Sequence, residues 1–160
     1  MYDRNAAVEY AHKYAHDNNP AYMTYEGLGG DCTNFISQCL YAGGAQMNFT
    51  PDFGWYYIDG NDKAPAWTGV EFLYNFLTAN KSVGPYGIET TARYMMPGDK
   101  IQLSFNNVIF GHSLFVVKTG RRPSPRNILI ATHTDNSDFR PLITYLSAAA
   151  VRYIHILGSR

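Results

Sequence analysis

The spacing of apolar residues changes once along this chain, and that change limits the fold more than any other feature. Before residues 97–99 (Pro-Gly-Asp), apolar side chains recur at helical spacing, and after them they alternate as they do in β-strands. Helices that precede a run of strands are typical of a layer of helices packed on an antiparallel sheet. The pattern therefore predicts an α+β fold.

The apolar pattern also gives approximate bounds for each element. It predicts helices over residues 4–17, over residues 32–41 and from Thr68 or Gly69 to Ala79, and strands over residues 100–105, 112–119, 128–134 and 151–157. Thr68 and Glu71 have the spacing of a capping box at the start of the third helix. Residues 45–66 and 137–141 have the composition of loops and turns.

The length and charge of the chain narrow its class. Its 160 residues fit one domain over residues 1–160. It has 13 Lys and Arg residues and 13 Asp and Glu residues, so its formal net charge is zero and no basic tract favours nucleic acid. No apolar run approaches the ~20 residues of a membrane span. Residues 1–5 do not look like a signal peptide, which leaves a cytoplasmic protein or a domain of a longer secreted chain.

Cys32 stands directly after a glycine turn and begins the second predicted helix. The local sequence is Gly29-Gly30-Asp31-Cys32-Thr33. The first backbone N–H groups of a helix lack intrahelical partners, and the helix dipole places partial positive charge there. A thiol at this position is expected to ionise more easily, and the thiolate is the nucleophilic form. We therefore predict that Cys32 is a catalytic nucleophile.

The second cysteine, Cys39, is predicted to be structural. It follows Cys32 by seven residues on the same helix, which separates the two by ~10 Å along the helix axis. That distance exceeds the reach of a disulfide, and the spacing does not match the C-x-x-C pattern of zinc or redox sites. The apolar residues around Cys39 indicate that it packs in the core.

Two histidines further along the chain could complete a catalytic site. His112 follows Gly111 at the start of a predicted strand, where a rigid backbone would hold a general base. His133 and Asp135 share one face of the next predicted strand, so either could orient the imidazole of His112. Cysteine first, histidine second and a polar orienting residue third is the chain order of papain-like cysteine hydrolases.

Other chemistries fit these residues less well. His112, His133 and Asp135 could together bind zinc, but that site leaves Cys32 unexplained unless its thiol is a fourth ligand. A serine mechanism lacks the G-x-S-x-G motif. Residues 27–30 are glycine-rich, but no Lys-Ser/Thr pair follows them as in a phosphate-binding loop. The residues therefore favour a thiol mechanism that needs no metal or other cofactor.

The residues around Cys32 resemble a known family. The string Gly30-Asp31-Cys32-Thr33-Asn34-Phe35 resembles the Asp-Cys-Ser-Gly-Phe type motif of NlpC-like cell-wall peptidases. The longer string over residues 29–40, with His133-Thr134-Asp135-Asn136 and Arg140-Pro141-Leu142 later, resembles the bacterial putative amidase domain family. That family is grouped with the NlpC-like and CHAP-type amidases in the papain-like superfamily. The resemblance extends from the first helix to the last strand.

The resemblance implies roles for the site residues. It implies Cys32 as the nucleophile and His112 as the base. The third position falls on His133 if the histidine of the NlpC pattern is followed, and on Asp135 or Asn136 if the domain uses an acid or an amide instead.

The resemblance also implies residues that bind the substrate or the oxyanion. A tyrosine upstream of the cysteine assists the oxyanion site in NlpC-like enzymes, and Tyr25 and Tyr22 are the candidates here. Asp31, beside the nucleophile, is the other candidate. The implied fold is papain-like, with N-terminal helices packed on an antiparallel β-sheet.

The implied substrate is an amide bond of bacterial peptidoglycan, either in the stem peptide or between the lactyl group of the sugar and the peptide. We expect a cysteine amidase or peptidase that acts on peptidoglycan or its peptide fragments. We expect it to be secreted or cell-wall associated as part of a longer chain. An acyl transferase on the same fold and a catalytically silent wall-binding module are the alternatives, and the oligomeric state stays open.

Overall fold

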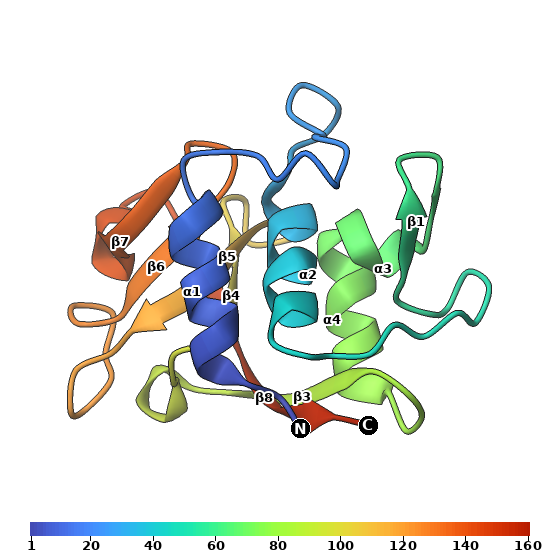
Figure 1. The fold of residues 1–160 in the computed structure, drawn as a ribbon. Coiled ribbons are helices and arrows are strands. Elements are labelled where there is room, and N and C mark those ends of the chain that lie inside the picture. The colour runs from blue at the N-terminus through green and yellow to red at the C-terminus, as the bar shows by residue number, and fades with distance from the viewer.

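The computed structural model describes residues 1–160, and its centre is a six-stranded antiparallel β-sheet. The strands lie in the order β3-β8-β4-β5-β6-β7. Their bounds are Pro85–Thr90 (β3), Lys100–Ser104 (β4), Phe110–Lys118 (β5), Leu129–Thr132 (β6), Ser137–Pro141 (β7) and Ala150–Ser159 (β8). The helices α1 (Arg4–Tyr14), α2 (Cys32–Ala42) and α4 (Val70–Ala79) lie on one face of this sheet (Figure 1). The predicted α+β class is confirmed.

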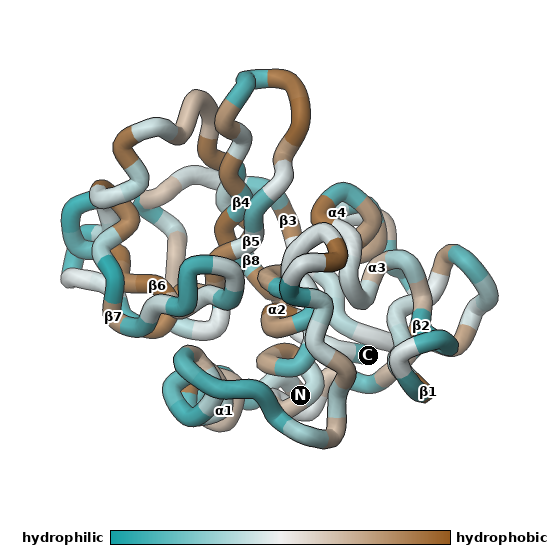
Figure 2. Tube along the Cα trace, turned by 90° about the horizontal axis from the view of Figure 1, so that it is seen from above, coloured by the Kyte–Doolittle hydropathy of each residue, from teal (hydrophilic) through white to brown (hydrophobic).

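The two faces of the sheet pack against separate apolar layers. Phe115 and Ile154 belong to the layer between the sheet and the helices, whereas Ile101 and Leu114 belong to the opposite layer. The opposite layer also contains Met95 and residues next to the short helices η1 (Ala92–Tyr94) and η2 (Leu142–Thr144). Seen from above, hydrophobic segments recur on α2, α4 and the strands (Figure 2). The sheet is therefore covered on both faces.

The predicted third helix is divided into two helices. The first, α3 (Pro65–Thr68), ends at Gly69, whose extended backbone (φ −101°, ψ 128°) makes it the N-cap of α4. The expected capping box of Thr68 and Glu71 is therefore wrong. Glu71 instead accepts a hydrogen bond of 2.8 Å from Arg152 on β8.

The four predicted strands form β4, β5, β6 and β8, and the pattern missed the two edges of the sheet, β3 and β7. β7 pairs with β6 although its residues have turn composition, because an edge strand needs only one partner and its side chains stay largely in contact with water. The segment predicted as a long loop contains a small hairpin of β1 (Tyr57–Asp59) and β2 (Asp62–Lys63). None of the helices has both the length and the apolar composition needed to cross a membrane.

Candidate active site

Cys32 is the first residue of α2, and its side chain lies against strand β5. The residue is 6% exposed, and the thiol contacts the backbone N–H of Ser113 and the hydroxyl of Thr33, whose oxygen is 4.0 Å from the sulfur. The Thr33 hydroxyl in turn hydrogen-bonds the Ser113 hydroxyl at 2.8 Å. Contacts between α2 and β5 thus fix the position of the sulfur.

The ionisation of Cys32 differs from the expectation. Burial raises the pKa of the Cys32 thiol, although the hydrogen bonds from Ser113 and Thr33 and the positive charge of Lys100 lower it. The helix start alone therefore does not produce a resting thiolate, because the loss of solvation outweighs the favourable contacts. At rest Cys32 is a thiol that needs a base. Cys39 is fully buried in the core, as predicted, and both cysteines are free.

The N-terminus of α2 has no side-chain cap. Asp31 occupies the N-cap position, but its carboxylate accepts no hydrogen bond from the backbone N–H groups of the first turn. It accepts hydrogen bonds from the backbone N–H of Tyr25 and the side chain of Asn34, and it pairs with His133. Asp31 is 1% exposed, so the expectation that it binds substrate is not met. The uncapped N–H groups of the first turn stay available to a ligand oxygen.

His133 does not approach His112. Its Nδ1 donates to the Asp31 carboxylate at 2.6 Å, its Nε2 donates to the backbone carbonyl of Tyr14 at 2.6 Å, and its ring stacks on Phe35. Burial alone lowers the pKa of His133, but these hydrogen bonds and the charge of Asp31 outweigh burial and raise it. Both ring nitrogens are occupied, so the prediction that His133 orients His112 is wrong for this geometry.

His112 lies near the start of β5 and lines a cavity of about 540 Å³ with residues of the β6–β7 turn and the η2 segment. Its ring makes no hydrogen bond to any residue, including Cys32. The next residue of β5 is Ser113, whose N–H reaches the thiol. Burial, assisted by the charge of Arg140 and opposed by Asp135, lowers the pKa of His112 to about 4. At neutral pH the imidazole is therefore uncharged and able to accept a proton.

Asp135 lines the same cavity but does not hydrogen-bond His112. Its side chain is 80% exposed, and its carboxylate accepts a hydrogen bond of 2.9 Å from Arg140. Strand β6 ends at Thr132, and the backbones of Thr134 and Asp135 have positive φ angles of 60° and 65°. His133 and Asp135 therefore do not share a strand face, because the chain has already turned away from the sheet.

Tyr145 is a site residue that the sequence did not indicate. Its ring adjoins His112, with 5.9 Å between the ring centroids, and the Arg140 guanidinium lies 3.8 Å from its centroid. The Tyr145 hydroxyl is buried and has no hydrogen-bond partner. Burial raises the pKa of Tyr145 to about 12, and the charge of Cys32 contributes in the same direction. Tyr145 follows η2 in an irregular segment without a motif, so no pattern could have identified it.

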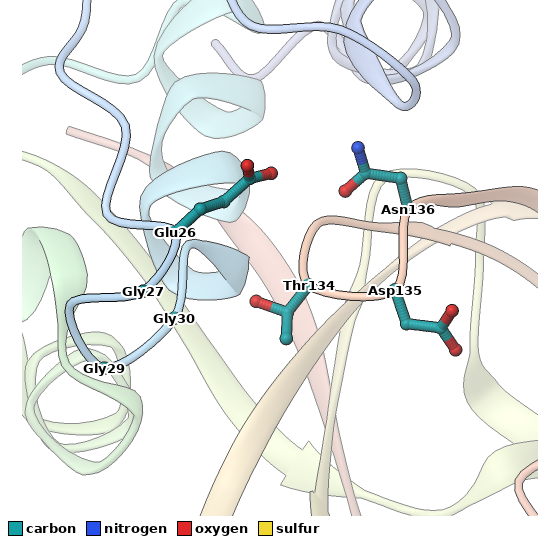
Figure 3. A pocket seen from close by; sticks show the side chains of 7 residues that line it. All are labelled: Glu26, Gly27, Gly29, Gly30, Thr134, Asp135 and Asn136. Atoms are coloured by element: carbon teal, nitrogen blue, oxygen red, sulfur yellow. The ribbon is translucent and has the colours of Figure 1, made fainter.

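A second cavity of about 710 Å³ lies beside the first. It is bounded by the loop of Glu26 to Gly30 on one side and by the turn of Thr134 to Asn136 on the other (Figure 3). Thr134 and Asp135 line both cavities, so the turn separates them. The backbone N–H of Asp31 donates to the Thr134 hydroxyl at 3.2 Å, which ties this turn to the residue before Cys32.

The remaining predicted residues are occupied elsewhere. The Tyr25 hydroxyl donates to the carbonyl of Gly60 at 3.0 Å, and Tyr22 packs with Tyr57 and Trp67. Neither tyrosine is thus placed as the expected donor to an oxyanion. The alternative zinc site is not assembled, since no three His, Cys, Asp or Glu side chains form a group that could hold a metal ion.

Comparisons with known proteins identify the family. The family model described as the putative amidase domain matches residues 1–156 of this chain. The uncharacterized protein YhbB of Bacillus subtilis (strain 168) is 35% identical over 144 residues, which are 88% of this chain and 44% of that protein. The chain therefore spans less than half the length of this curated relative, and no solved structure matches it. Since the family model covers nearly the whole chain, the chain belongs to the putative amidase domain family, whose description indicates amidase-like activity.

Proposed function

We propose that the protein is a cysteine-dependent amidase or peptidase that hydrolyses amide bonds of bacterial peptidoglycan. One observation carries the proposal: the thiol of Cys32, at the uncapped start of α2, lies against the strand that holds the neutral imidazole of His112 beside an open cavity. Papain-like hydrolases likewise use a cysteine nucleophile together with a histidine base. We propose the same relationship to the NlpC-like and CHAP-type enzymes.

The proposed reaction begins when His112 accepts the proton of the Cys32 thiol. The sulfur attacks the amide carbon, so an S–C bond forms and the carbonyl oxygen becomes an oxyanion. The C–N bond then breaks, and the departing amine takes the proton held by His112. Water attacks the resulting thioester while His112 accepts a proton from it. The C–S bond then breaks, the acid product leaves, and the thiolate recovers a proton from His112.

The donors for the oxyanion are the backbone N–H of Cys32 and the hydroxyl of Tyr145. The N–H group points out of an uncapped helix start, where the dipole favours negative charge. The Tyr145 hydroxyl has no partner within the protein and lies beside His112. A substrate carbonyl between the two would supply the missing acceptor.

We propose that no residue orients His112 through a direct hydrogen bond. Asp135 and Arg140 act on the imidazole through their charges, in opposite directions. His133 holds the loop before Cys32 in place through Asp31, which makes its contribution to the site structural.

The two neighbouring cavities suit an extended peptide substrate. Most of the residues that line them are not hydrophobic, and both are open to solvent on either side of the turn at Thr134 and Asp135. A stem peptide could lie across this turn with its scissile amide near His112. Such a substrate also implies that the protein acts outside the cytoplasm.

A digest of purified peptidoglycan, followed by mass spectrometry of the released fragments, tests this function. Hydrolysis should yield a new free amine and a new carboxyl group at one type of amide bond. Transfer of the acyl group to an added amine, in place of water, would instead support an acyl transferase. Binding to the wall without any new fragment would support a silent wall-binding module and overturn the proposal.

A further inference from the structure

Lys100 carries a buried amino group that the proposed mechanism does not use. The residue is 0% exposed, and its Nζ has no hydrogen-bond partner. Only one other buried side-chain polar atom in the protein lacks a partner, the hydroxyl of Tyr145 in the active site. Lysines are almost never fully buried without a paired charge, because desolvation of the ammonium group is costly. The position of Lys100 therefore calls for a functional explanation.

The strand register places Lys100 on the face of β4 that supports α2. Lys100 lies opposite Phe115 and Ile154, and both belong to the core between the sheet and the helices. Gln102, two residues further along the same face, lies opposite Ser113. Ser113 is the residue that contacts both Thr33 and the thiol at the start of α2. Lys100 thus lies in the layer between the sheet and the helices, two residues along β4 from the position opposite Ser113.

Three charged groups act on the ammonium of Lys100, and only one of them is a negative charge that no other residue pairs. They are Arg152 on β8, Glu71 on α4 and Cys32 on α2. Arg152 repels the ammonium, and Glu71 is already paired with Arg152 at 2.8 Å. The Cys32 thiolate is the remaining negative charge. The effect is mutual, since the charge of Lys100 lowers the pKa of Cys32 and the charge of Cys32 raises the pKa of Lys100.

We propose that Lys100 is the internal counter-charge of Cys32, a buried ammonium that stabilises the thiolate as His112 removes its proton. This inference rests on the proposed function. Lys100 is a positioning residue, because it acts through Cys32 and does not touch the substrate. The S–H bond breaks, the proton moves to His112, and Lys100 keeps its own proton throughout. In a medium of low dielectric constant a charge acts over several ångströms without a hydrogen bond.

The proposal gives the reactivity of Cys32 a specific dependence on pH. Burial, with help from Arg152, lowers the pKa of Lys100 to about 7. Below that pH the ammonium is present and the thiolate is stabilised. Above it Lys100 is a neutral amine, and the stabilisation disappears.

Alkylation of Cys32 measures this effect without any substrate. The rate constant with iodoacetamide would be followed from about pH 5.5 to about pH 9 by mass spectrometry of the peptide that contains Cys32. Lys100→Met keeps the length of the side chain and removes the charge. Wild type should react about tenfold faster than Lys100→Met near pH 6, as for a difference of about one pKa unit, and the ratio should fall towards one by about pH 9. Lys118→Met, an exposed position on β5, should match wild type at every pH.

A ratio near one in mild acid, or a ratio that does not change with pH, would overturn the proposal and make Lys100 structural. If Lys100→Met does not fold, the wild-type profile decides instead. The logarithm of its rate constant should flatten near pH 7, where Lys100 loses its proton, and a steady unit slope up to the thiol pKa would contradict the inference. Alkylation does not require amide hydrolysis. An inactive protein with this profile would therefore reject the proposed function and leave the role of Lys100 intact.

Discussion

At the scale of single residues, the site pairs two groups that are both neutral at rest. Burial raises the pKa of Cys32 and lowers the pKa of His112, so neither group favours its charged form. A thiol and a neutral imidazole can exchange a proton only when the product charges are stabilised. We assign that stabilisation to Lys100 for the thiolate and to Asp135 for the imidazolium.

The loss of activity at low pH should follow the protonation of His112. Its pKa is lowered to about 4, so the imidazole is protonated and unable to act as a base only below that pH. The ratio kcat/KM should therefore fall as the pH drops through about 4 rather than through the ordinary value of about 6.5. Arg140→Gln should move this loss of activity to higher pH and Asp135→Asn to lower pH, because the two charges act in opposite directions. A loss of activity near the ordinary value that neither variant moves would contradict the assignment of the base.

The hydroxyl of Tyr145 should contribute to the rate of the chemical step, measured as kcat, and not to substrate binding, measured as KM. Tyr145→Phe removes a buried hydroxyl that has no partner in the free protein, so the fold should tolerate the change. Loss of one oxyanion donor typically lowers kcat about 100-fold with little change in KM. Tyr153→Phe is the matched control, because Tyr153 is a half-buried tyrosine of β8 that packs against the same apolar layer as Tyr145 but lines neither cavity. Equal kcat for the two variants would remove Tyr145 from the proposed mechanism.

At the scale of elements, the pair of His133 and Asp31 joins the end of β6 to the loop before α2. Both side chains are about 1% exposed, and the two are bonded at 2.6 Å. The N–H of Asp31 also donates to Thr134 in the turn after β6. Two links therefore set the position of Cys32 relative to the cavity.

The ion pair should stabilise the fold more in acid than in base. The pKa of His133 is raised in the folded state, so its contribution is complete below the unfolded value of about 6.5 and is lost as the pH rises through the folded value. His133→Gln should cost about 3 kcal/mol in the free energy of unfolding near pH 6 and clearly less near pH 9, measured with urea. His12→Gln breaks a more exposed pair with Asp138 and should cost below about 1 kcal/mol. A loss for His133→Gln that is the same at both pH values would contradict the charged pair.

Gly29 and Gly30, in the loop before α2, both have strained backbones, but only Gly30 lies close to Thr134, so substitutions there can distinguish the two effects. Gly29 and Gly30 have φ angles of 102° and 101°, so alanine at either position should cost about 1 kcal/mol of stability. A Cβ on Gly30 would lie 3.3 Å from the Thr134 hydroxyl oxygen, whereas a Cβ on Gly29 would meet nothing within 4 Å. Gly30→Ala should therefore lower kcat/KM several-fold below that of Gly29→Ala. Equal activity at equal stability would show that the link to Thr134 does not shape the site.

At the scale of the whole molecule, the sequence was informative where one periodic pattern dominates. The change of apolar period predicted the α+β class and the strands β4, β5, β6 and β8, because those strands have buried faces. It missed the edge strands β3 and β7, which need less apolar surface.

The candidate site was predictable only in part, for physical reasons that differ between residues. The motif around Cys32 and the position of His112 indicated two residues that lie at the start of α2 and near the start of β5, the strand that contacts α2. The role of His133 could not be predicted, because the turn at Thr134 breaks the strand pattern and the ring bonds Asp31 instead. The proposed roles of Lys100 and Tyr145 rest on buried polar atoms that have no hydrogen-bond partner. That property belongs to the folded chain, and no local sequence pattern predicts it.

The most direct test of the central claim compares two cysteine variants on purified peptidoglycan. Fragments released by wild type, Cys32→Ala and Cys39→Ala would be quantified by liquid chromatography and mass spectrometry. Wild type should release amide-cleaved fragments, Cys32→Ala should release none above background, and Cys39→Ala, which alters only the buried core, should retain cleavage once its stability is matched by temperature. Cleavage by Cys32→Ala at the rate of wild type would contradict the cysteine mechanism.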